Sequence, residues 1–303
     1  MEHVELLIIG AGPAGLTAAI YARRAGRSVR LLEKAAVGGQ IAASPRVDNF
    51  PGLPGVPGAE LADRLFEQAT GLGAELELEE ALSIRREAEG TFTVTTDYGT
   101  HTCGALLFAG GMTHRTLGLP REDTLPGVSY CAVCDGAFYA GRDAAVCGGG
   151  NTALQEALYL AGICRHVTLI HRRAAFRADA VLVDALRQRE NAAILTDTVI
   201  DALLGEDCLT GVRLRNEKTG ETRDLPVSGL FQAVGQLPQT GLLSGLLPLD
   251  RDGFLPVGED GRTAVPGLFI AGDCRAKELR QLTTACADGA CAAVSALRYL
   301  EAR

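Results

Sequence analysis

Two cysteines three positions apart are the residues of this chain best suited to covalent chemistry. Cys131 and Cys134 enclose Ala132 and Val133, and Asp135 follows directly. Cys-x-x-Cys spacing depresses the pKa of one thiol, and the thiolate is the form that attacks a disulfide. Asp135 could exchange the protons by which dithiol and disulfide states differ, or it could cap a helix, and we favour proton exchange. The motif therefore predicts disulfide exchange.

Three other interpretations of this cysteine pair compete with redox chemistry. Zinc usually takes four ligands, and the chain has neither a second Cys-x-x-Cys motif nor paired histidines. A structural disulfide is rare in a chain with cytoplasmic features. Burial as small apolar residues is the third alternative, and we expect it for most of the other cysteines, which are Cys103, Cys147, Cys164, Cys208, Cys274, Cys286 and Cys291. We favour the redox pair and predict no metal site.

Two segments that could position a cofactor share one pattern, in which an apolar strand runs into a glycine cluster and then into an alanine-rich helix. The strands are predicted at residues 4–9 and 144–147, and the helices should close at left-handed caps formed by Gly26 and Gly162. In such a turn one glycine permits the bend, a second lets a pyrophosphate approach the backbone, and a third lets helix and strand pack closely. The clusters read Gly10, Ala11, Gly12, Pro13, Ala14, Gly15 and Gly148, Gly149, Gly150, Asn151, Thr152, Ala153.

The residues about 20 positions beyond each cluster differ in charge. A strand predicted at residues 28–32 ends in Glu33, whose carboxylate can bond ribose hydroxyls and would repel a 2′-phosphate. A strand predicted at residues 167–170 ends instead in basic residues, which suit a 2′-phosphate and favour NADPH over NADH, with a solvated basic patch as the alternative. These basic residues are His171, Arg172, Arg173 and Arg177. A lone glycine motif is weak evidence, but this context strengthens it.

Length, charge and hydropathy limit the partners. The 303 residues are 47% hydrophobic, which is enough for two cores, and the net charge of −8 argues against nucleic acid as a partner. No stretch of about 20 apolar residues occurs, and the start of the chain lacks the features of a signal peptide, so we expect no membrane contact and a cytoplasmic location. Residues 91–96 alternate like a strand of a small antiparallel ribbon.

In this order, the motifs resemble those of the bacterial-type, low-molecular-weight thioredoxin reductases, over nearly all 303 residues. Several of them are ordinary loop sequences individually, so their order provides the specificity. The motifs are Gly10 to Gly15, Gly38 to Ile41, Val47 to Gly52 with Asp48, Cys131 to Gly136, Gly148 to Ala153, His171 to Ala178, Val234 to Gln236, Gly272 with Asp273, and Arg280 with Gln281.

The resemblance implies an α/β fold with two doubly wound, Rossmann-like three-layer domains. The FAD-binding domain would be discontinuous, at residues 1–113 and 243–303, and residues 114–242 would form an NADPH-binding domain that carries the dithiol. The implied FAD contacts are Gly10, Gly12, Pro13, Ala14, Gly15, Glu33, Gly39, Gln40, Asn49, Asp273, Arg280 and Gln281. The implied NADPH contacts are Gly150, Asn151, Thr152, His171, Arg172, Arg173 and Arg177.

The reaction implied by the resemblance passes a hydride from NADPH to FAD, opens a Cys131–Cys134 disulfide and reduces thioredoxin or a thioredoxin-like protein through a mixed disulfide. Cys134 would be the thiol nearer the flavin, Asp135 the acid and base, and the protein a homodimer. One domain would have to rotate about segments near residues 110–118 and 235–241. A small-molecule dithiol oxidase or a ferredoxin-driven reductase would not need the basic cluster. A non-catalytic flavin redox sensor would not need both a nicotinamide site and Asp135.

Overall fold

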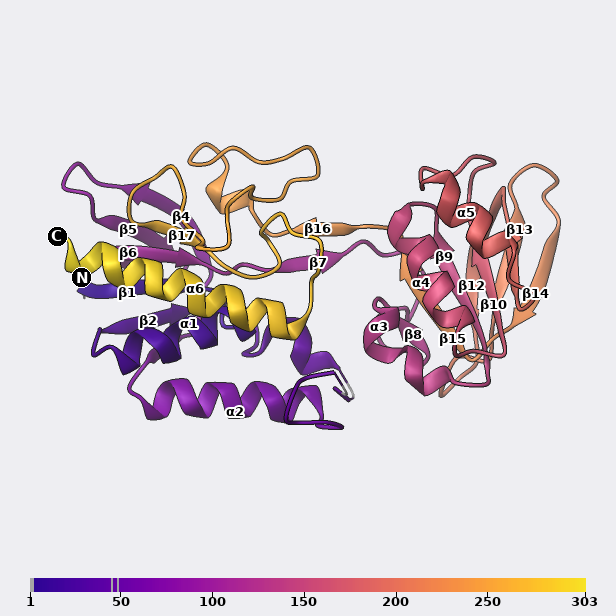
Figure 1. Cartoon of the computed structure of the whole chain (residues 1–303), viewed down its shortest axis with the longest axis horizontal. Coiled ribbons are helices and arrows are strands. Elements are labelled where there is room, and N and C mark those ends of the chain that lie inside the picture. The colour runs from indigo at the N-terminus through magenta and orange to yellow at the C-terminus, as the bar shows by residue number, and fades with distance from the viewer. Residues whose placement is uncertain (1–2, 45, 48) are drawn as a thin grey trace. The chain divides into compact units, whose positions relative to one another are not determined.

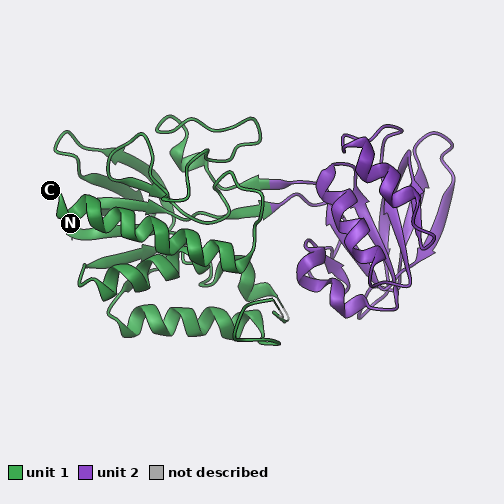
Figure 2. Ribbon diagram, viewed as in Figure 1, with its two compact units in different colours: residues 1–113, 237–303 green, residues 114–236 purple. Residues whose placement is uncertain are grey.

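The computed structural model describes residues 3–44, 46–47 and 49–303, which form two compact units (Figure 2). Unit 1 comprises residues 1–113 and 237–303, and unit 2 comprises residues 114–236. Asp48, which is part of the family resemblance, lies outside the described residues. The chain therefore leaves unit 1 once and returns to it once.

Unit 1 is built on a seven-stranded sheet in the order β3-β2-β1-β6-β5-β4, with β17 also paired to β6. The strands are β1 (His3–Ile9), β2 (Val29–Leu32), β3 (Glu75–Glu77), β4 (Ala81–Arg86), β5 (Phe92–Thr96), β6 (Thr100–Phe108) and β17 (Leu268–Ile270). The strands β3, β2, β1, β6 and β17 pair in parallel, and β4, β5 and β6 form an antiparallel ribbon that includes the predicted strand at 91–96. Because Ile9 pairs with Leu32 and with Phe108, the glycine turn and Glu33 follow at one edge of the sheet.

The central strand of unit 1 is buried on both faces, which explains its continuous apolar sequence. Leu6 and Ile8 pack into the cluster that includes residues of α1 and α6, whereas Leu7 and Ile9 pack with residues of β5 and β6 on the other face. The helices are α1 (Pro13–Arg24), α2 (Gly58–Gly71) and α6 (Leu282–Glu301), with short 3-10 turns η1 (Gly39–Ala43) and η3 (Gly241–Leu243). Figure 1 shows α1 between the sheet and α2, and the two helices are in contact.

Unit 2 repeats the plan with a parallel five-stranded sheet in the order β11-β10-β9-β15-β8. Its parallel strands are β8 (Val128–Ser129), β9 (Asp143–Gly148), β10 (His166–Ile170), β11 (Ala192–Leu195) and β15 (Gly229–Ala233). Its helices are α3 (Ala132–Asp135), α4 (Asn151–Ala161) and α5 (Ala180–Arg187), with the 3-10 turn η2 (Gly136–Tyr139). An antiparallel sheet consists of β12 (Thr198–Leu204), β13 (Gly211–Asn216) and β14 (Thr222–Pro226).

The layers of unit 2 follow from the alternation of side chains along β9. Ala144 and Val146 pack with residues of α4 and α5, while Ala145 and Cys147 pack with residues of β12 and β13. A separate antiparallel sheet thus forms the third layer of unit 2, whereas the antiparallel strands of unit 1 continue its seven-stranded sheet. The predicted α/β class with two Rossmann-like domains is confirmed.

Two connecting segments, β7 (Met112–His114) and β16 (Gln236–Pro238), pair as a two-stranded ribbon. Arg115 N–H donates to Gly235 O at 3.0 Å, and Gln239 N–H donates to Gly111 O at 3.0 Å. The resemblance places the second crossing near residues 235–241 and the domain boundary between residues 242 and 243, and the compact units divide between residues 236 and 237. This division lies at the β7–β16 pair, because the pairing brings the return segment level with the departing one.

The predicted helix caps are half right. Gly26 has φ +79° just beyond α1, as a left-handed cap requires, and its N–H donates to Arg23 O at 2.9 Å. Gly162 has φ −77° and a right-handed backbone, so the prediction of a left-handed cap there is wrong. The last turn of α4 instead continues past Gly162, where Cys164 N–H donates to Leu160 O at 2.7 Å.

Candidate functional site

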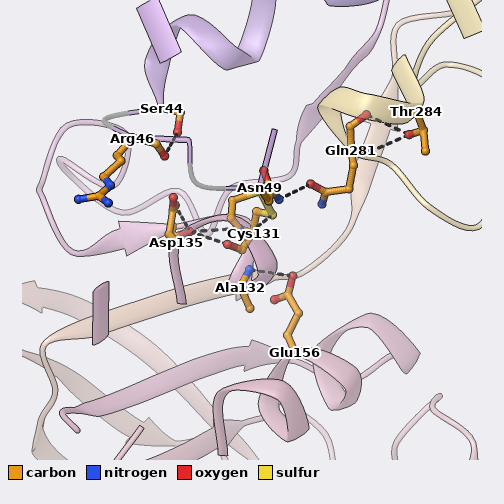
Figure 3. Close-up of a disulfide and its surroundings, with 11 residues drawn as sticks. Ser44, Arg46, Asn49, Cys131, Ala132, Asp135, Glu156, Gln281 and Thr284 are labelled. Atoms are coloured by element: carbon orange, nitrogen blue, oxygen red, sulfur yellow. Dashed lines mark hydrogen bonds between the residues drawn. A yellow bond between two sulfur atoms is a disulfide. The ribbon is translucent and has the colours of Figure 1, made fainter. Parts of the chain in front are cut away.

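Cys131 and Cys134 form a disulfide in the first turn of unit 2 after β8, with their Cα atoms 5.3 Å apart (Figure 3). Cys131 is the residue before α3, and its Sγ accepts the N–H of Cys134 at 3.2 Å. Val133, between the two cysteines, is 48% exposed. The dithiol thus lies on a short, locally bonded turn that a protein partner can reach.

Asp135 is bonded next to this disulfide rather than to a helix end. Its Oδ2 accepts the hydroxyl of Ser129 at 2.7 Å, and its side chain makes no capping hydrogen bond. The capping alternative for Asp135 is therefore not what the structure shows. Burial raises the pKa of Asp135 above its usual value of 3.8, and the Ser129 hydroxyl acts in the opposite direction. A carboxyl of raised pKa beside a disulfide suits proton exchange.

Glu156 of α4 is a second carboxyl close to the dithiol turn, and the sequence analysis missed it. Its Oε1 lies 3.5 Å from the N–H of Ala132, at the long limit of a hydrogen bond (Figure 3). Its Oε2 is buried without a hydrogen-bond partner among the described residues. Burial raises its pKa from 4.5 to about 7. A single half-buried carboxyl on a mostly apolar helix gives no pattern that sequence reading could have used.

The glycines of the first turn fill three distinct structural roles. A Cβ on Gly10, which has φ +103°, would lie 2.4 Å from Ala109 O, and one on Gly15 would lie 1.9 Å from Gly10 O. A Cβ on Gly12 would meet nothing within 4 Å. Gly10 therefore makes the bend, Gly15 allows close packing, and Gly12 leaves its backbone open to a ligand. Pro13 begins α1, and Ala14 packs against α6, where a Cβ on Gly289 would lie 2.1 Å from Ala14 O.

The same edge of unit 1 holds a cavity of about 360 Å³, lined by Gly10, Glu33 and residues of β4. Glu33 turns its carboxylate back onto the glycine turn, where Oε2 accepts the N–H of Ala11 at 2.9 Å. Gly39 lies beside the turn as well, because a Cβ on it would come within 3.5 Å of Gly12 Cα. Unit 1 therefore offers an elongated site that starts at the glycine turn and runs along the strand ends.

The remaining predicted FAD contacts lie on loops of unit 1. Asn49 donates to Gln281 Oε1 at 3.0 Å, and Gln281 is the N-cap residue of α6 (Figure 3). Arg280 stacks over the Phe254 ring at 4.0 Å and donates to Asp273 O at 3.3 Å. The side-chain amide of Gln40 donates to the carbonyl oxygen of Met112, within the same unit.

Asp273 is joined to a buried ion network that the sequence analysis also missed. Lys277 Nζ lies 2.9 Å from Asp273 Oδ1 and 3.0 Å from Asp288 Oδ2, and Arg275 pairs with Asp288 at 2.8 Å. The Lys277–Asp273 contact lacks hydrogen-bond geometry, so Asp273 Oδ1 is buried without a hydrogen bond among the described residues. The ammonium of Lys277 compensates the charge of this oxygen, and a ligand with a donor group would supply the missing hydrogen bond.

The second glycine turn has the same division of roles as the first. A Cβ on Gly148 would lie 2.4 Å from Ala233 O, whereas a Cβ on Gly150 would meet nothing within 4 Å. Asn151 begins α4, and its side-chain amide makes two hydrogen bonds to Asp179. Its Nδ2 donates to Asp179 Oδ2 at 2.9 Å, and its Oδ1 accepts the backbone N–H of Asp179 at 2.8 Å. Thr152, in the first turn of α4, is exposed. The open backbone at Gly150 and the free helix start form the second candidate dinucleotide site.

The basic cluster divides into a buried and an exposed part. His171 is 7% exposed, stacks on Phe176 at 4.8 Å, and donates from Nε2 to Ala175 O at 3.1 Å. Its ring lies against the second turn, since a Cβ on Gly149 would come within 2.1 Å of it. The loop is held to the turn by Arg177 N–H, which donates to Gly149 O at 2.9 Å. The exposed members of the cluster are Arg172, Arg173 and Arg177.

The other cysteines are mostly as predicted. The four buried ones are Cys103, Cys147, Cys164 and Cys274. Burial raises the pKa of Cys103, Cys147 and Cys274 to about 12, which keeps them as unreactive thiols. Cys208 and Cys291 are exposed, contrary to a buried role, and Cys286 is half-buried.

Among the described residues, no group of three or more histidine, cysteine or carboxylate residues is placed to hold a metal ion. None of the helices formed by the described residues combines the length and hydrophobicity that crossing a bilayer requires.

A family model described as pyridine nucleotide-disulphide oxidoreductase matches residues 4–289, and the chain belongs to this family. It is 40% identical over 300 residues to a bifunctional thioredoxin reductase/thioredoxin of Mycobacterium leprae (strain TN), covering 98% of this chain and 66% of that protein. It is 42% identical over 313 residues to a glucosaminate ammonia-lyase of Pseudomonas fluorescens, covering 99% and 97%. The names of these two relatives state different activities, a disulfide reduction and an ammonia elimination. The residues of the candidate site indicate which activity fits this chain.

A solved structure agrees with the first of these names. The thioredoxin reductase from Streptococcus pyogenes MGAS5005 matches with a TM-score of 0.95 and 37% identity, over 99% of each chain. The predicted resemblance to bacterial-type thioredoxin reductases and the enzyme class that follows from it are confirmed.

Proposed function

We propose that this chain is a thioredoxin reductase that uses FAD and NADPH to reduce oxidised thioredoxin, with Cys131 and Cys134 as its dithiol. The observation that carries the proposal is the Cys131–Cys134 disulfide beside the half-buried Asp135, in the same unit as the second glycine turn. Elimination of ammonia from a sugar acid involves no net electron transfer, so a lyase reaction would leave this disulfide without a role.

The residues of unit 1 fit FAD. The open backbone at Gly12 suits a pyrophosphate, and the cavity of about 360 Å³ beside Glu33 suits the adenosine. Asp273 Oδ1, which pairs with Lys277 and has no hydrogen bond among the described residues, would accept from a ligand hydroxyl. Gln40, Asn49, Arg280 and Gln281 would complete the site, as the family resemblance implies. When bound, FAD and NADPH supply hydride and electron transfer, and the protein supplies binding and alignment.

The residues of unit 2 fit NADPH. Gly150 leaves room for the pyrophosphate at the start of α4, and Asn151 and Thr152 lie in that first turn. The exposed guanidinium groups of the basic cluster suit the 2′-phosphate, because they bind phosphate oxygens bidentately. The buried ring of His171 packs against Gly149 of the glycine turn, so His171 has a structural role in the site.

Asp135 is the protein group placed to exchange protons at the dithiol. Conversion of the Cys131–Cys134 disulfide into two thiols needs two electrons and two protons, which NADPH and one solvent proton would supply, with Asp135 exchanging protons with the cysteines. One cysteine thiolate then attacks a sulfur of the partner disulfide, which breaks that bond and forms a mixed disulfide. The second cysteine attacks the mixed disulfide, restores Cys131–Cys134 and releases the partner as a dithiol. Exposure of Val133 lets a protein partner approach the turn.

An anaerobic titration of the FAD-loaded protein tests the proposal. NADPH should bleach the flavin absorbance, and oxidised thioredoxin should then restore it. A flavin that stays oxidised with NADPH, or that is not reoxidised by thioredoxin, would contradict the proposed function. Ammonia release from glucosaminate by the same preparation, with no flavin reoxidation by thioredoxin, would favour the lyase name instead.

The finer expectations belong to the same proposal. We propose a homodimer and a cytoplasmic location, on the basis of the family resemblance and of the sequence features given above. Sedimentation equilibrium of the FAD-loaded protein would test the first, and fractionation of cells that express the chain would test the second.

A further inference from the structure

The buried hydroxyl of Ser129 joins the two parts of the dithiol site. Ser129 is 4% exposed, and its Oγ accepts the backbone N–H of Cys131 at 3.1 Å. The same Oγ lies 2.7 Å from Asp135 Oδ2 and 3.5 Å from the carbonyl oxygen of Cys131. A hydroxyl has one hydrogen to donate, and a short hydrogen bond to a charged carboxylate is stronger than a long one to a carbonyl oxygen. Ser129 therefore accepts from the first cysteine and donates to Asp135.

Ser129 itself is held by the core of unit 2. It is the last residue of β8 and pairs with Phe231 of β15, whose side chain is fully buried. The backbone of Ser129 is thus fixed in the sheet, and its hydroxyl donates to the carboxylate of Asp135, six residues later. Asp135 Oδ1 accepts no hydrogen bond from the part of the chain that the structure describes, so this oxygen is left for proton exchange.

We propose that Ser129 is a positioning residue, whose hydroxyl holds the Asp135 carboxylate in place beside the Cys131–Cys134 disulfide. The proposal rests on the proposed function, in which Asp135 exchanges the protons of the dithiol. Donation from Ser129 favours the ionised carboxylate and partly offsets the effect of burial. Among the described residues, Tyr139 of η2 is a titratable group that interacts with Asp135. Its pKa is raised by burial and by the charge of Asp135, and Arg142 acts in the opposite direction.

Three variants of the FAD-loaded protein separate the hydroxyl from its volume. Ser129→Ala removes the donor, Ser129→Cys keeps a similar shape with a weak donor, and Ser129→Thr keeps the hydroxyl. Loss of a hydrogen bond to a charged acceptor should raise the pKa of Asp135 by about one unit in the alanine and cysteine variants. The threonine variant should return to the wild-type value. The cysteine variant provides the test if the alanine variant fails to fold.

The first measurement titrates the carboxyl of Asp135 directly. The ¹³C shift of aspartate-labelled holoprotein is followed against pH with the disulfide intact, and Asp135→Asn assigns the signal. An unchanged pKa in Ser129→Ala and Ser129→Cys would overturn the proposal, as would the same rise in all three variants, which would show an effect of packing. This measurement needs neither NADPH nor thioredoxin, so it decides on Ser129 even if the proposed function fails.

The second measurement is the pH dependence of kcat with saturating thioredoxin. The acidic limb of the profile should move up by about one unit in Ser129→Ala and return in Ser129→Thr. A loss of kcat by the same factor at every pH would mean that Ser129 is merely structural, and it would overturn the proposal. A wild-type protein that does not reduce thioredoxin at any pH would refute the proposed function and leave the titration as the test of Ser129.

Discussion

Replacement of Glu156 by glutamine should stabilise this protein at pH 8 and have little such effect at pH 5. Glu156 is half-buried beside the dithiol turn, and its buried Oε2 has no hydrogen-bond partner among the described residues. Burial raises its pKa from 4.5 to about 7, because the carboxylate loses its hydration in the folded protein. Glutamine has nearly the same shape and no charge at either pH.

The sign and size of the effect follow from proton linkage. The folded protein binds more protons at Glu156 than the unfolded chain does between pH 4.5 and about 7. The stability from this group is therefore fully present below pH 4.5 and is lost as the pH rises to about 7. Integrated from pH 5 to pH 8, the loss is about 2.5 kcal/mol. The stability difference between Glu156→Gln and wild type should grow by that amount over this range.

Urea unfolding followed by far-UV circular dichroism measures this difference. The chain contains no tryptophan, so indole fluorescence cannot report on it. The FAD-loaded wild-type and variant proteins are compared at pH 5 and pH 8, and the transition of unit 2 gives the free energy of unfolding. Comparing the two pH values cancels the cost of placing an amide in the site, which is the same at both.

A matched control is the exposed Glu190 of the same unit. Glu190→Gln makes the same chemical change on the surface, and its effect should differ between the two pH values by no more than a few tenths of a kcal/mol. The reasoning would be refuted if Glu156→Gln were as insensitive to pH as Glu190→Gln, because Glu156 would then ionise without a burial penalty.

The remaining predictions concern the proposed reaction. Cys131→Ser should still allow NADPH to bleach the flavin but should abolish thioredoxin reduction in a coupled assay, and full turnover would remove the dithiol from the mechanism. Replacing Arg172 and Arg173 by alanine should raise KM for NADPH about 10- to 100-fold in steady-state kinetics and change KM for NADH little, and equal effects would deny them the 2′-phosphate. Gly150→Ala should fold, because its Cβ points into open space, and the same Cβ should weaken NADPH binding by at least tenfold in calorimetry by filling the space of the pyrophosphate. Gly15→Ala should unfold at a lower urea concentration than wild type, because its Cβ would lie 1.9 Å from a backbone oxygen. Normal nucleotide affinity in Gly150→Ala would contradict the role of that open face.

The sequence was sufficient wherever the information is local. Both glycine turns, the strands before them and the cysteine pair could be predicted because each depends on residues within about ten positions. The different roles of Gly10 and Gly12 also follow from their order in the motif, and the backbone geometry agrees. Glu33 was found from its distance to the turn, although its carboxylate bonds Ala11 in this structure.

The features that could not be predicted depend on contacts between elements. The Ser129–Asp135 hydrogen bond requires β8 to pair with β15, and no local sequence pattern predicts this pairing. Glu156 reaches the dithiol turn only because α4 packs beside α3. Gly162 has the sequence of a left-handed cap, but the hydrogen bonds that follow α4 keep it right-handed. Tertiary packing overrides local preference in each case.

Unit 1 consists of two segments separated in sequence by unit 2, and this arrangement determines the order in which the two units are synthesised. Residues 114–236 are continuous, so unit 2 can fold as soon as it emerges, because domains generally fold as units from the N-terminus. Unit 1 must wait, since β17 completes the pairing of β6 and α6 covers α1, and both are synthesised after unit 2. Asp273, Arg280 and Gln281 emerge after unit 2 and after the other residues proposed to bind FAD. Flavin binding to the complete site therefore follows the synthesis of unit 2, when the dithiol turn already exists.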